Sequence, residues 1–203
     1  MSSVITVAIP SIAPRTTLLA RALASVATQN NPAVAVSIAF DTAREGAPAT
    51  RDRALAGVTT TWVAFLDDDD EMNPEHLQAL MMHAETTGAD LVYPWYDVVG
   101  GMDPFPQWEH DAWCDSAPHQ VPVTFLARTD AIRAVGGFSY DWDASQGSDP
   151  GVDSGGNRAG EDYRLILRLA RGGVKIVHLD QRTWKWHHDS GNTSGLPSRW
   201  SAS

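Results

Sequence analysis

The sequence predicts an α/β domain built on an open, mostly parallel β-sheet with helices on both faces. Apolar runs of strand length alternate with segments whose apolar residues recur at helical spacing, an order typical of such sheets. Acidic residues directly follow three of these runs, at Asp41, at 67–70 and at Asp97. Ligands of open α/β sheets bind beyond the carboxyl ends of the strands. The pattern therefore also predicts a ligand site lined by carboxylates.

The first half of the chain is expected to supply most of the sheet. Pro10 is expected to end the first strand, and the segment 42–50 is expected to be a loop. The helix at 74–88 begins near a proline and stops at Gly88, as helices often do. The helix at 16–29 has apolar residues on one face, among them Leu19 and Val26. The predicted strands are 4–9, 33–40, 61–66 and 89–96, and the predicted helices are 16–29, 51–58 and 74–88.

The second half is less regular and predicts a smaller, mixed region beside the sheet. Its helix at 161–173 has Leu165, Ile166 and Leu169 at inward positions. The segment 139–160 is rich in Gly, Ser and Asp and is expected to be a mobile loop. The other predicted elements are strands at 121–128, 174–179 and 183–188, and a short helix at 129–138.

Composition limits the classes of protein that fit. The chain has 203 residues, a net charge of −10 and a pI of about 4.9, which argue against a large nonspecific polyanion-binding surface. Its only cysteine, Cys114, excludes an internal disulfide. We see no run of 18 apolar residues and no basic leader before the first apolar run, so we expect no transmembrane segment or signal peptide. A cytoplasmic location is the default expectation.

The stretch FLDDDDEM places four aspartates and Glu71 after a buried strand. Adjacent carboxylates repel, so the cluster costs stability unless a cation or hydrogen-bond donors compensate. Ligand sets made only of oxygen favour Mg²⁺ or Mn²⁺. The alternative is a solvated turn or the negative charge that favours a helix start, which suits Asp70 and Glu71 because they lead towards the next helix. Asp67 follows the strand directly, so metal binding is favoured.

Other polar residues each have two interpretations. Glu161 and Asp162 open a helix, where they are either helix-start charges or a general base facing the site. Asp41 could accept hydrogen bonds from a nucleobase or a sugar, and Arg51 or Arg53 could contact phosphate. The alternative for these three is a surface ion pair.

Two histidines lie in the predicted strand 183–188. Alternation puts His188 on one face with Trp184 and Trp186, and His187 on the other face. Either histidine could complete a metal site with the aspartates, or be structural.

Several segments also carry the motifs of one enzyme family. ITVAIPSIAPRTTLLARALASVATQ is similar to its opening strand, turn and first helix, and SIAFD to its second strand. ATRDRALAGVTTTWVAFLDDDDEMNPEHL is similar to A-R-N-x-(G/A)…F-L-D-x-D-D…P-x-x-L, with Asp52 where Asn is usual. VPVTFLARTDAIRAVGGF, GEDYRLILRLARGGVKIV and HHDSGNTS are similar to its later segments. The ordered set resembles the GT-A fold glycosyltransferases, specifically the large family 2 of inverting, nucleotide-sugar-dependent enzymes.

The resemblance implies a fold, an activity and a cofactor. It implies a single GT-A, Rossmann-like domain over 1–203, with a nucleotide-sugar half at 1–98 and an acceptor and catalytic half at 99–203. It implies metal-dependent transfer of a sugar, with Mn²⁺ or Mg²⁺, from a nucleotide-diphosphate donor to an acceptor hydroxyl with inversion. A UDP-sugar is the favoured donor, and the acceptor could be a glycan, a lipid-linked glycan or a modified nucleobase.

Roles follow position by position from the same resemblance. Donor binding is implied for Pro10, Ser11, Asp41, Arg51, Asp67 and Asp68. Metal binding is implied for Asp67, Asp69 and His188, with His187 as the alternative histidine. Catalysis is implied for Asp162 as the base, with Glu161 beside it. The run has more aspartates than the D-x-D pattern, so the register of that pattern could differ by one residue.

The acceptor side and the alternatives depend on other features. We expect Trp95, Trp108, Trp113 and the 139–160 loop on the acceptor side, because aromatic faces suit sugars. A nucleotidyltransferase would usually carry a Gly-rich basic loop after the first strand, and PSIAPRTT has no glycine. A non-catalytic sugar- or nucleotide-binding module of the same fold is the other alternative, and hydrolysis of a nucleotide sugar would distinguish it from an enzyme.

Overall fold

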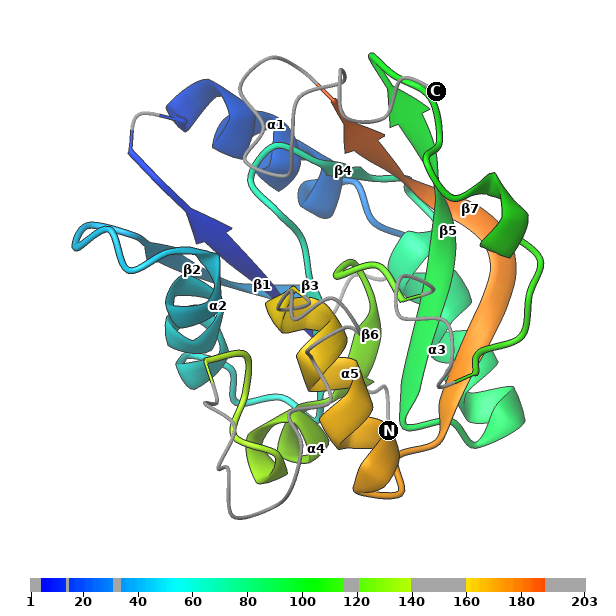
Figure 1. Cartoon of the computed structure of the whole chain (residues 1–203). Coiled ribbons are helices and arrows are strands. Elements are labelled where there is room, and N and C mark those ends of the chain that lie inside the picture. Colours follow the sequence, from blue (N-terminus) through cyan, green and yellow to red (C-terminus); the bar gives the residue numbers. More distant parts are fainter. Residues whose placement is uncertain (1–4, 14, 31–33, 115–120, 140–159, 189–203) are drawn as a thin grey trace, which may run out of the picture.

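In the computed structural model, one sheet runs through the described residues, which are 5–13, 15–30, 34–114, 121–139 and 160–188. Its seven strands follow the order β2-β1-β3-β6-β5-β7-β4 (Figure 1). None of the helices in these residues is long and apolar enough to cross a membrane. The strands are β1 (Ile5–Ser11), β2 (Val34–Phe40), β3 (Trp62–Phe65), β4 (Glu71–Met72), β5 (Leu91–Val99), β6 (Leu126–Arg128) and β7 (Ile176–His187).

Helices pack on both faces of the sheet (Figure 1). Buried residues of α1 and α3 form one core with the sheet, and those of α2, α4 and α5 form a second core. The helices are α1 (Thr16–Ala27), α2 (Ala47–Ala56), α3 (His76–Thr87), α4 (Thr129–Ala134) and α5 (Glu161–Arg171), with a short 3₁₀ turn η1 (Pro106–Trp108).

Alternation along the central strands explains why both cores exist. In β3, Trp62 and Ala64 face the core of α1 and α3, whereas Val63 and Phe65 face the core of α2, α4 and α5. Successive side chains of a strand point to opposite faces, so a fully apolar run such as WVAF suits a strand that is covered on both sides. Burying each large apolar side chain contributes about 1.5–3 kcal/mol.

The α/β class is confirmed, but the sheet is mixed rather than mostly parallel. Three pairings are parallel (β1–β2, β1–β3 and β5–β7), and three are antiparallel (β3–β6, β5–β6 and β4–β7). The antiparallel pairs involve the short strands β6 and β4. The prediction missed this because the direction of a short strand depends on its partners, not on its own apolar pattern.

Several boundaries also differ from the predicted ones. β4 was not predicted, and β7 is one strand where two were expected. β1 continues through Pro10 to Ser11, beyond the last pairing with β3 at Ala8, where a missing N–H is tolerated. α2 begins at Ala47, inside the expected loop, because Pro48 lies in its first turn and proline is pre-shaped for that position.

Both predicted halves of the chain contribute to this sheet. β6 lies between β3 and β5, and β7 lies beside β5. The division into a donor half at 1–98 and an acceptor half at 99–203 stays a prediction.

A carboxylate on α2 holds the turn that follows α4. Asp52 Oδ1 accepts a hydrogen bond from the N–H of Phe138, and Oδ2 accepts one from Ser139, both at 2.8 Å. Gly137 has φ +72°, and a Cβ there would lie 2.3 Å from Asp52 Oδ1. The turn therefore needs a glycine, and it uses both oxygens of the aspartate.

Asp52→Asn is expected to lower the free energy of unfolding by about 1–2 kcal/mol, because the amide NH₂ would face a backbone N–H and leave it unpaired. Urea unfolding followed by circular dichroism measures this change. Glu85→Gln on the exposed side of α3 is the control, with an expected change within about 0.5 kcal/mol. Equal stability of the Asp52→Asn variant and the wild type would contradict the prediction.

Candidate active site

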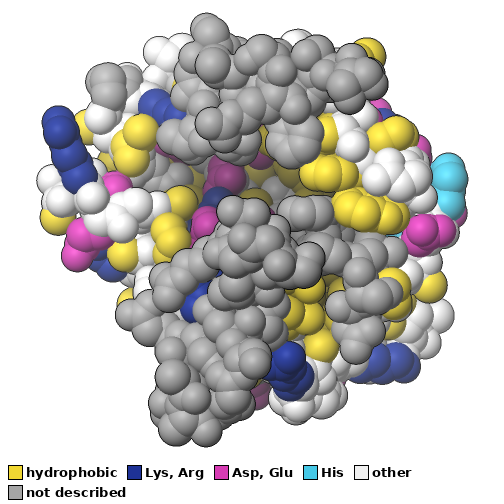
Figure 2. Space-filling view, in the orientation of Figure 1, with side chains coloured by type: hydrophobic (Ala, Val, Ile, Leu, Met, Phe, Trp, Pro, Cys, Tyr) yellow, Lys and Arg dark blue, Asp and Glu magenta, His cyan; other side chains and the backbone are white. Residues whose placement is uncertain are grey.

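A cavity of about 1140 Å³ lies beyond the carboxyl ends of β1, β2 and β3. Its lining includes residues 10–13, Asp41, residues 67–70 and the first turns of α2 and α5. Figure 2 shows acidic and basic side chains together near the centre of this face, with hydrophobic side chains beside them. The position agrees with the ligand edge expected for an open α/β sheet.

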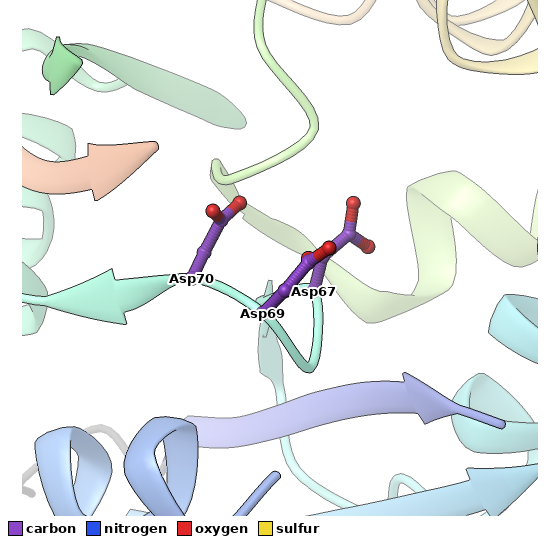
Figure 3. A group of neighbouring side chains, drawn as sticks. All are labelled: Asp67, Asp69 and Asp70. Carbon is purple, nitrogen blue, oxygen red and sulfur yellow. The ribbon is translucent and has the colours of Figure 1, made fainter. Parts of the chain in front are cut away.

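Three of the four consecutive aspartates converge. One carboxylate oxygen each of Asp67, Asp69 and Asp70 can be chosen so that all three lie within 4.8 Å of one another. The backbone N–H of Asp70 donates to the carbonyl of Asp67 at 3.1 Å, which closes a turn. Figure 3 shows the three side chains projecting from this turn, between β3 and β4.

The carboxylates of this cluster are partly buried and repel one another. Burial, followed by the charge of Asp67, raises the pKa of Asp69 to about 6. Burial, with the charges of Asp67 and Asp69, holds the pKa of Asp70 well above its ordinary value. A divalent cation would relieve this repulsion, and three carboxylates are a ligand set that suits Mg²⁺ or Mn²⁺. These three residues fit such an ion.

The prediction that Asp70 and Glu71 ease the start of the next helix is wrong. Glu71 belongs to β4, which pairs antiparallel with β7, and α3 begins later, at His76, with no acidic residue in its first turn. Asp70 accepts the backbone N–H of His187 at 2.9 Å and is part of the cluster. Sequence spacing could not show this, because β7 is distant in the sequence.

Asp68 points away from the cluster, towards the end of β1. Its carboxylate accepts hydrogen bonds from Ser11 Oγ at 2.7 Å and from Arg15 Nη1 at 2.9 Å. Pro10, Ser11 and Asp68 all line the cavity. Their predicted contacts with the nucleoside stay predictions.

Arg51 connects the two acidic sides of the cavity. Its side chain comes from α2 and is almost fully buried, with the whole residue 6% exposed. Nη2 donates to Asp67 Oδ1 and Oδ2 at 2.8 and 3.0 Å, and Nη1 donates to Glu161 Oε1 at 2.5 Å. The guanidinium therefore holds Glu161, at the start of α5, close to Asp67, which lies just after β3.

Asp162 follows Glu161 in the first turn of α5 and also lines the cavity. Burial is the main cause that raises the pKa of Asp162; the charge of Glu161 adds to it and Arg51 opposes it. A Cβ on Gly160 would lie 2.6 Å from Asp162 Oδ1, so the carboxylate occupies space that only glycine leaves. A carboxyl group with a raised pKa in a cavity is typical of a general base.

Asp41 is held rigidly at the end of β2. Its two carboxylate oxygens accept the backbone N–H groups of Glu45 and Gly46 at 2.9 and 2.8 Å. These hydrogen bonds lower its pKa. Arg53 lies 3.6 Å from the carboxylate, so the ion pair considered for Arg53 is present, and Asp41 still lines the cavity.

The two candidate histidines differ in their contacts. The ring Nε2 of His187 lies 2.7 Å from Glu71 Oε1. His188 is 4% exposed, and its ring packs against Trp186. Among the described residues its Nε2 has no hydrogen-bond partner, and it does not belong to the carboxylate group. Its role as a metal ligand stays a prediction.

The predicted acceptor-side tryptophans lie outside the cavity lining. Trp95 is fully buried, 0% exposed, and its Nε1 donates to Asp103 at 2.8 Å. The proposal that its ring stacks on an acceptor is therefore wrong, because neither face is open. Trp108 is half-buried and stacks on Phe105, and Trp113 packs against the core of α2, α4 and α5.

Sequence reasoning missed other aromatic residues of the cavity. The alternation that placed Trp184 and Trp186 on one face of the predicted strand was the available signal. Residues 140–159 of the predicted acceptor loop and the segment after His188 lie outside the described residues. The aromatic residues that line the cavity are Tyr96, Phe105, Trp184 and Trp186.

Comparisons with known proteins find related sequences and a similar fold. The pre-mycofactocin glycosyltransferase of Mycobacterium tuberculosis, strains CDC 1551 and H37Rv, is 29% identical in an alignment 147 residues long, which covers 65% of this chain and 28% of that protein. Staphylococcus aureus TarS 1–349 in complex with UDP-GlcNAc matches with a TM-score of 0.71 at 15% identity, over 98% of this chain and 61% of that one. The chain thus spans less than a third of its curated relative.

The structural likeness, at this identity, shows the fold, and it confirms the expected GT-A architecture. The model described as glycosyl transferase family 2 matches residues 35–139, which is more than half of the 203 residues. The matched range includes Asp41, Arg51 and the acidic segment. The chain therefore belongs to glycosyl transferase family 2.

Proposed function

We propose that the chain transfers a sugar from a UDP-sugar to an acceptor hydroxyl, with inversion and with Mn²⁺ or Mg²⁺ bound. One observation carries this proposal. A single cavity contains both the carboxylate cluster that fits a cation and, on α5, the base candidate Asp162. Support also comes from the relatives, which are named as glycosyltransferases, and from the TarS structure in complex with UDP-GlcNAc.

The donor side is assigned to the ends of β1, β2 and β3. Asp41 would accept hydrogen bonds from the base, and Pro10 and Ser11 would line the nucleoside pocket. Asp68 would contact the ribose. The bound cation would neutralise the diphosphate leaving group. The ligands proposed for it are Asp67, Asp69 and Asp70, with His188 as a further candidate because its buried Nε2 has no partner among the described residues.

The catalytic side is assigned to α5. Asp162 would take the proton from the acceptor hydroxyl while the hydroxyl oxygen of the acceptor attacks the anomeric carbon of the donor sugar. The bond from that carbon to the diphosphate breaks, and the nucleoside diphosphate leaves with the bonding electrons. Attack opposite the leaving group inverts the configuration. Glu161 would stay paired with Arg51. The arginine orients the start of α5, and its positive charge lowers the pKa of Asp162 against the effects of burial and Glu161.

Calorimetry with UDP tests the donor assignment. UDP is expected to bind when MnCl₂ or MgCl₂ is present and to show no measurable binding in EDTA, because without the cation the diphosphate would face the negatively charged aspartate cluster. ADP serves as the control for the base. Cation-independent binding of UDP would contradict the metal assignment.

A panel of UDP-sugars then tests catalysis, with release of UDP as the measured product. At least one donor is expected to be hydrolysed slowly without an acceptor. Silence on every donor, with cation and UDP bound, would favour a non-catalytic binding module. Release of pyrophosphate from a nucleoside triphosphate would favour a nucleotidyltransferase.

A further inference from the structure

Arg15 lies against the carboxylates of the acidic segment. Its Nη1 is 2.9 Å from Asp68 Oδ1 and 3.1 Å from Asp69 Oδ2. The side chain is 14% exposed and lines the cavity. A single cationic nitrogen thus bridges two carboxylates, and one of these, Asp69, belongs to the group that fits a divalent ion.

Asp69 shares Arg15 with Asp68, and the remaining donors differ from one aspartate to the next. Asp67 pairs with Arg51, Asp68 also accepts Ser11 Oγ, and Asp70 accepts a backbone N–H from β7. The side chain that donates to Asp69 is Arg15. A divalent ion on Asp69 and a guanidinium on the same carboxylate would repel each other strongly at such short separation.

The backbone of Arg15 is fixed while its side chain is long. The N–H of Arg15 donates to the carbonyl of Ile12, and its own carbonyl accepts the N–H of Leu19, both at 2.9 Å, at the start of α1. The flexible stem can therefore carry the guanidinium away from Asp69 without moving the helix. The cavity that it faces is the space assigned above to the donor.

We propose that Arg15 is an exchangeable counter-ion, which neutralises Asp69 in the cation-free protein and moves to the diphosphate of the donor when the cation binds. The inference rests on the proposed function. A guanidinium suits this exchange because it pairs with carboxylates and phosphates in the same bidentate geometry. The consequence is that cation and nucleotide bind with positive coupling, since the nucleotide provides a new partner for the displaced guanidinium.

The experiment measures two affinities by calorimetry, MnCl₂ alone and UDP at saturating MnCl₂, for the wild type and for Arg15→Gln. The variant is expected to bind Mn²⁺ about fivefold more tightly, because a competing charge is gone. It is expected to bind UDP about tenfold more weakly, because a charge-assisted contact is lost. A purely structural ion pair would not move the two affinities in opposite directions.

Arg21→Gln is the matched control. Arg21 also approaches this segment, but its Nη2 donates to the backbone carbonyl of Asp69 and its Nε lies 3.5 Å from Glu71. The substitution Arg21→Gln removes one positive charge close to the cluster but does not change a contact with the Asp69 carboxylate. The affinities for Mn²⁺ and for UDP should therefore both change less than about twofold. Arg15→Lys keeps a cation but loses the fork, so it should bind Mn²⁺ like the wild type and UDP about threefold more weakly.

The outcomes separate the two proposals. A wild type that binds neither Mn²⁺ nor UDP would overturn the proposed function, and this inference with it. A wild type that binds both, with Arg15→Gln unchanged or weakened for Mn²⁺, would overturn the inference alone. Circular dichroism checks that each variant folds; if Arg15→Gln does not fold, the decision rests on Arg15→Lys, whose unchanged UDP affinity would overturn the inference.

Discussion

Asp162→Asn is expected to lower the rate of sugar transfer by about 10²–10⁴-fold, which is the range supplied by a general base. UDP affinity should stay within about twofold of the wild type, because Asp162 lies on α5 and not among the donor-side aspartates. Asparagine keeps the shape of the side chain and an oxygen that accepts the N–H of Tyr163, so α5 should start as before. Calorimetry and a UDP-release assay with a transferable donor measure the two effects, and transfer at the wild-type rate would remove Asp162 as the base.

The pH dependence of transfer follows from the same carboxylate. Burial and Glu161 raise the pKa of Asp162, and a base acts only when deprotonated. The acidic limb of the pH–rate profile should therefore lie above the ordinary range of an aspartate. Glu161→Gln removes a neighbouring negative charge, so this limb should shift to lower pH. A limb that does not move would assign the titration to another group.

Asp69→Asn is expected to weaken Mn²⁺ binding more than about 100-fold, because losing even an outer partner of a metal ligand costs about 10–100-fold. Cation-dependent binding of UDP should be lost with it. Calorimetry with MnCl₂ measures the first effect, and Glu71→Gln is the matched control, because Glu71 is the first carboxylate after the four aspartates and lies outside the cluster. Mn²⁺ binding that survives in Asp69→Asn would place the cation elsewhere.

The same variant should be more stable than the wild type in the absence of cation at neutral pH. The folded-state pKa of Asp69 is raised from its ordinary value to about 6, so stability present at low pH is lost as pH rises through about 6. Asparagine carries no charge and does not show this loss. Thermal unfolding in EDTA at pH 5 and pH 7.5 measures the difference, and added Mn²⁺ should raise the wild-type Tm at pH 7.5 but not that of the variant.

The parts of the fold that local pattern determines could be predicted from the sequence. The apolar run at 61–66 was sufficient to place Asp67 at a strand end, and the spacing in 161–173 correctly predicted Leu165, Ile166 and Leu169 as buried. β4 could not be predicted, because a strand of two residues exists only through its pairing with β7. For the same reason, the continuity of β7 was missed.

The candidate site shows the same limit. Asp41, Arg51, Asp67 and Asp162 all line the cavity. Asp41 and Asp67 follow strands and Asp162 lies in the first turn of α5, whereas Arg51 reaches the cavity from the second turn of α2. Tertiary packing decided the rest. Trp95 was expected at the acceptor, but β5 is covered on both faces where the ring lies.

The acidic segment is attached at both ends to the same sheet, since β3 precedes it and β4 follows it. One residue gained or lost between Leu66 and Glu71 would shift β4 by one position along β7 and turn its side chains to the opposite face. We therefore expect evolution to restrict the length of this segment more strictly than the identity of each aspartate in it. If this segment is replaced by the corresponding loop of a related enzyme, a loop of equal length should be tolerated. A loop that is longer by a single residue should disrupt the site.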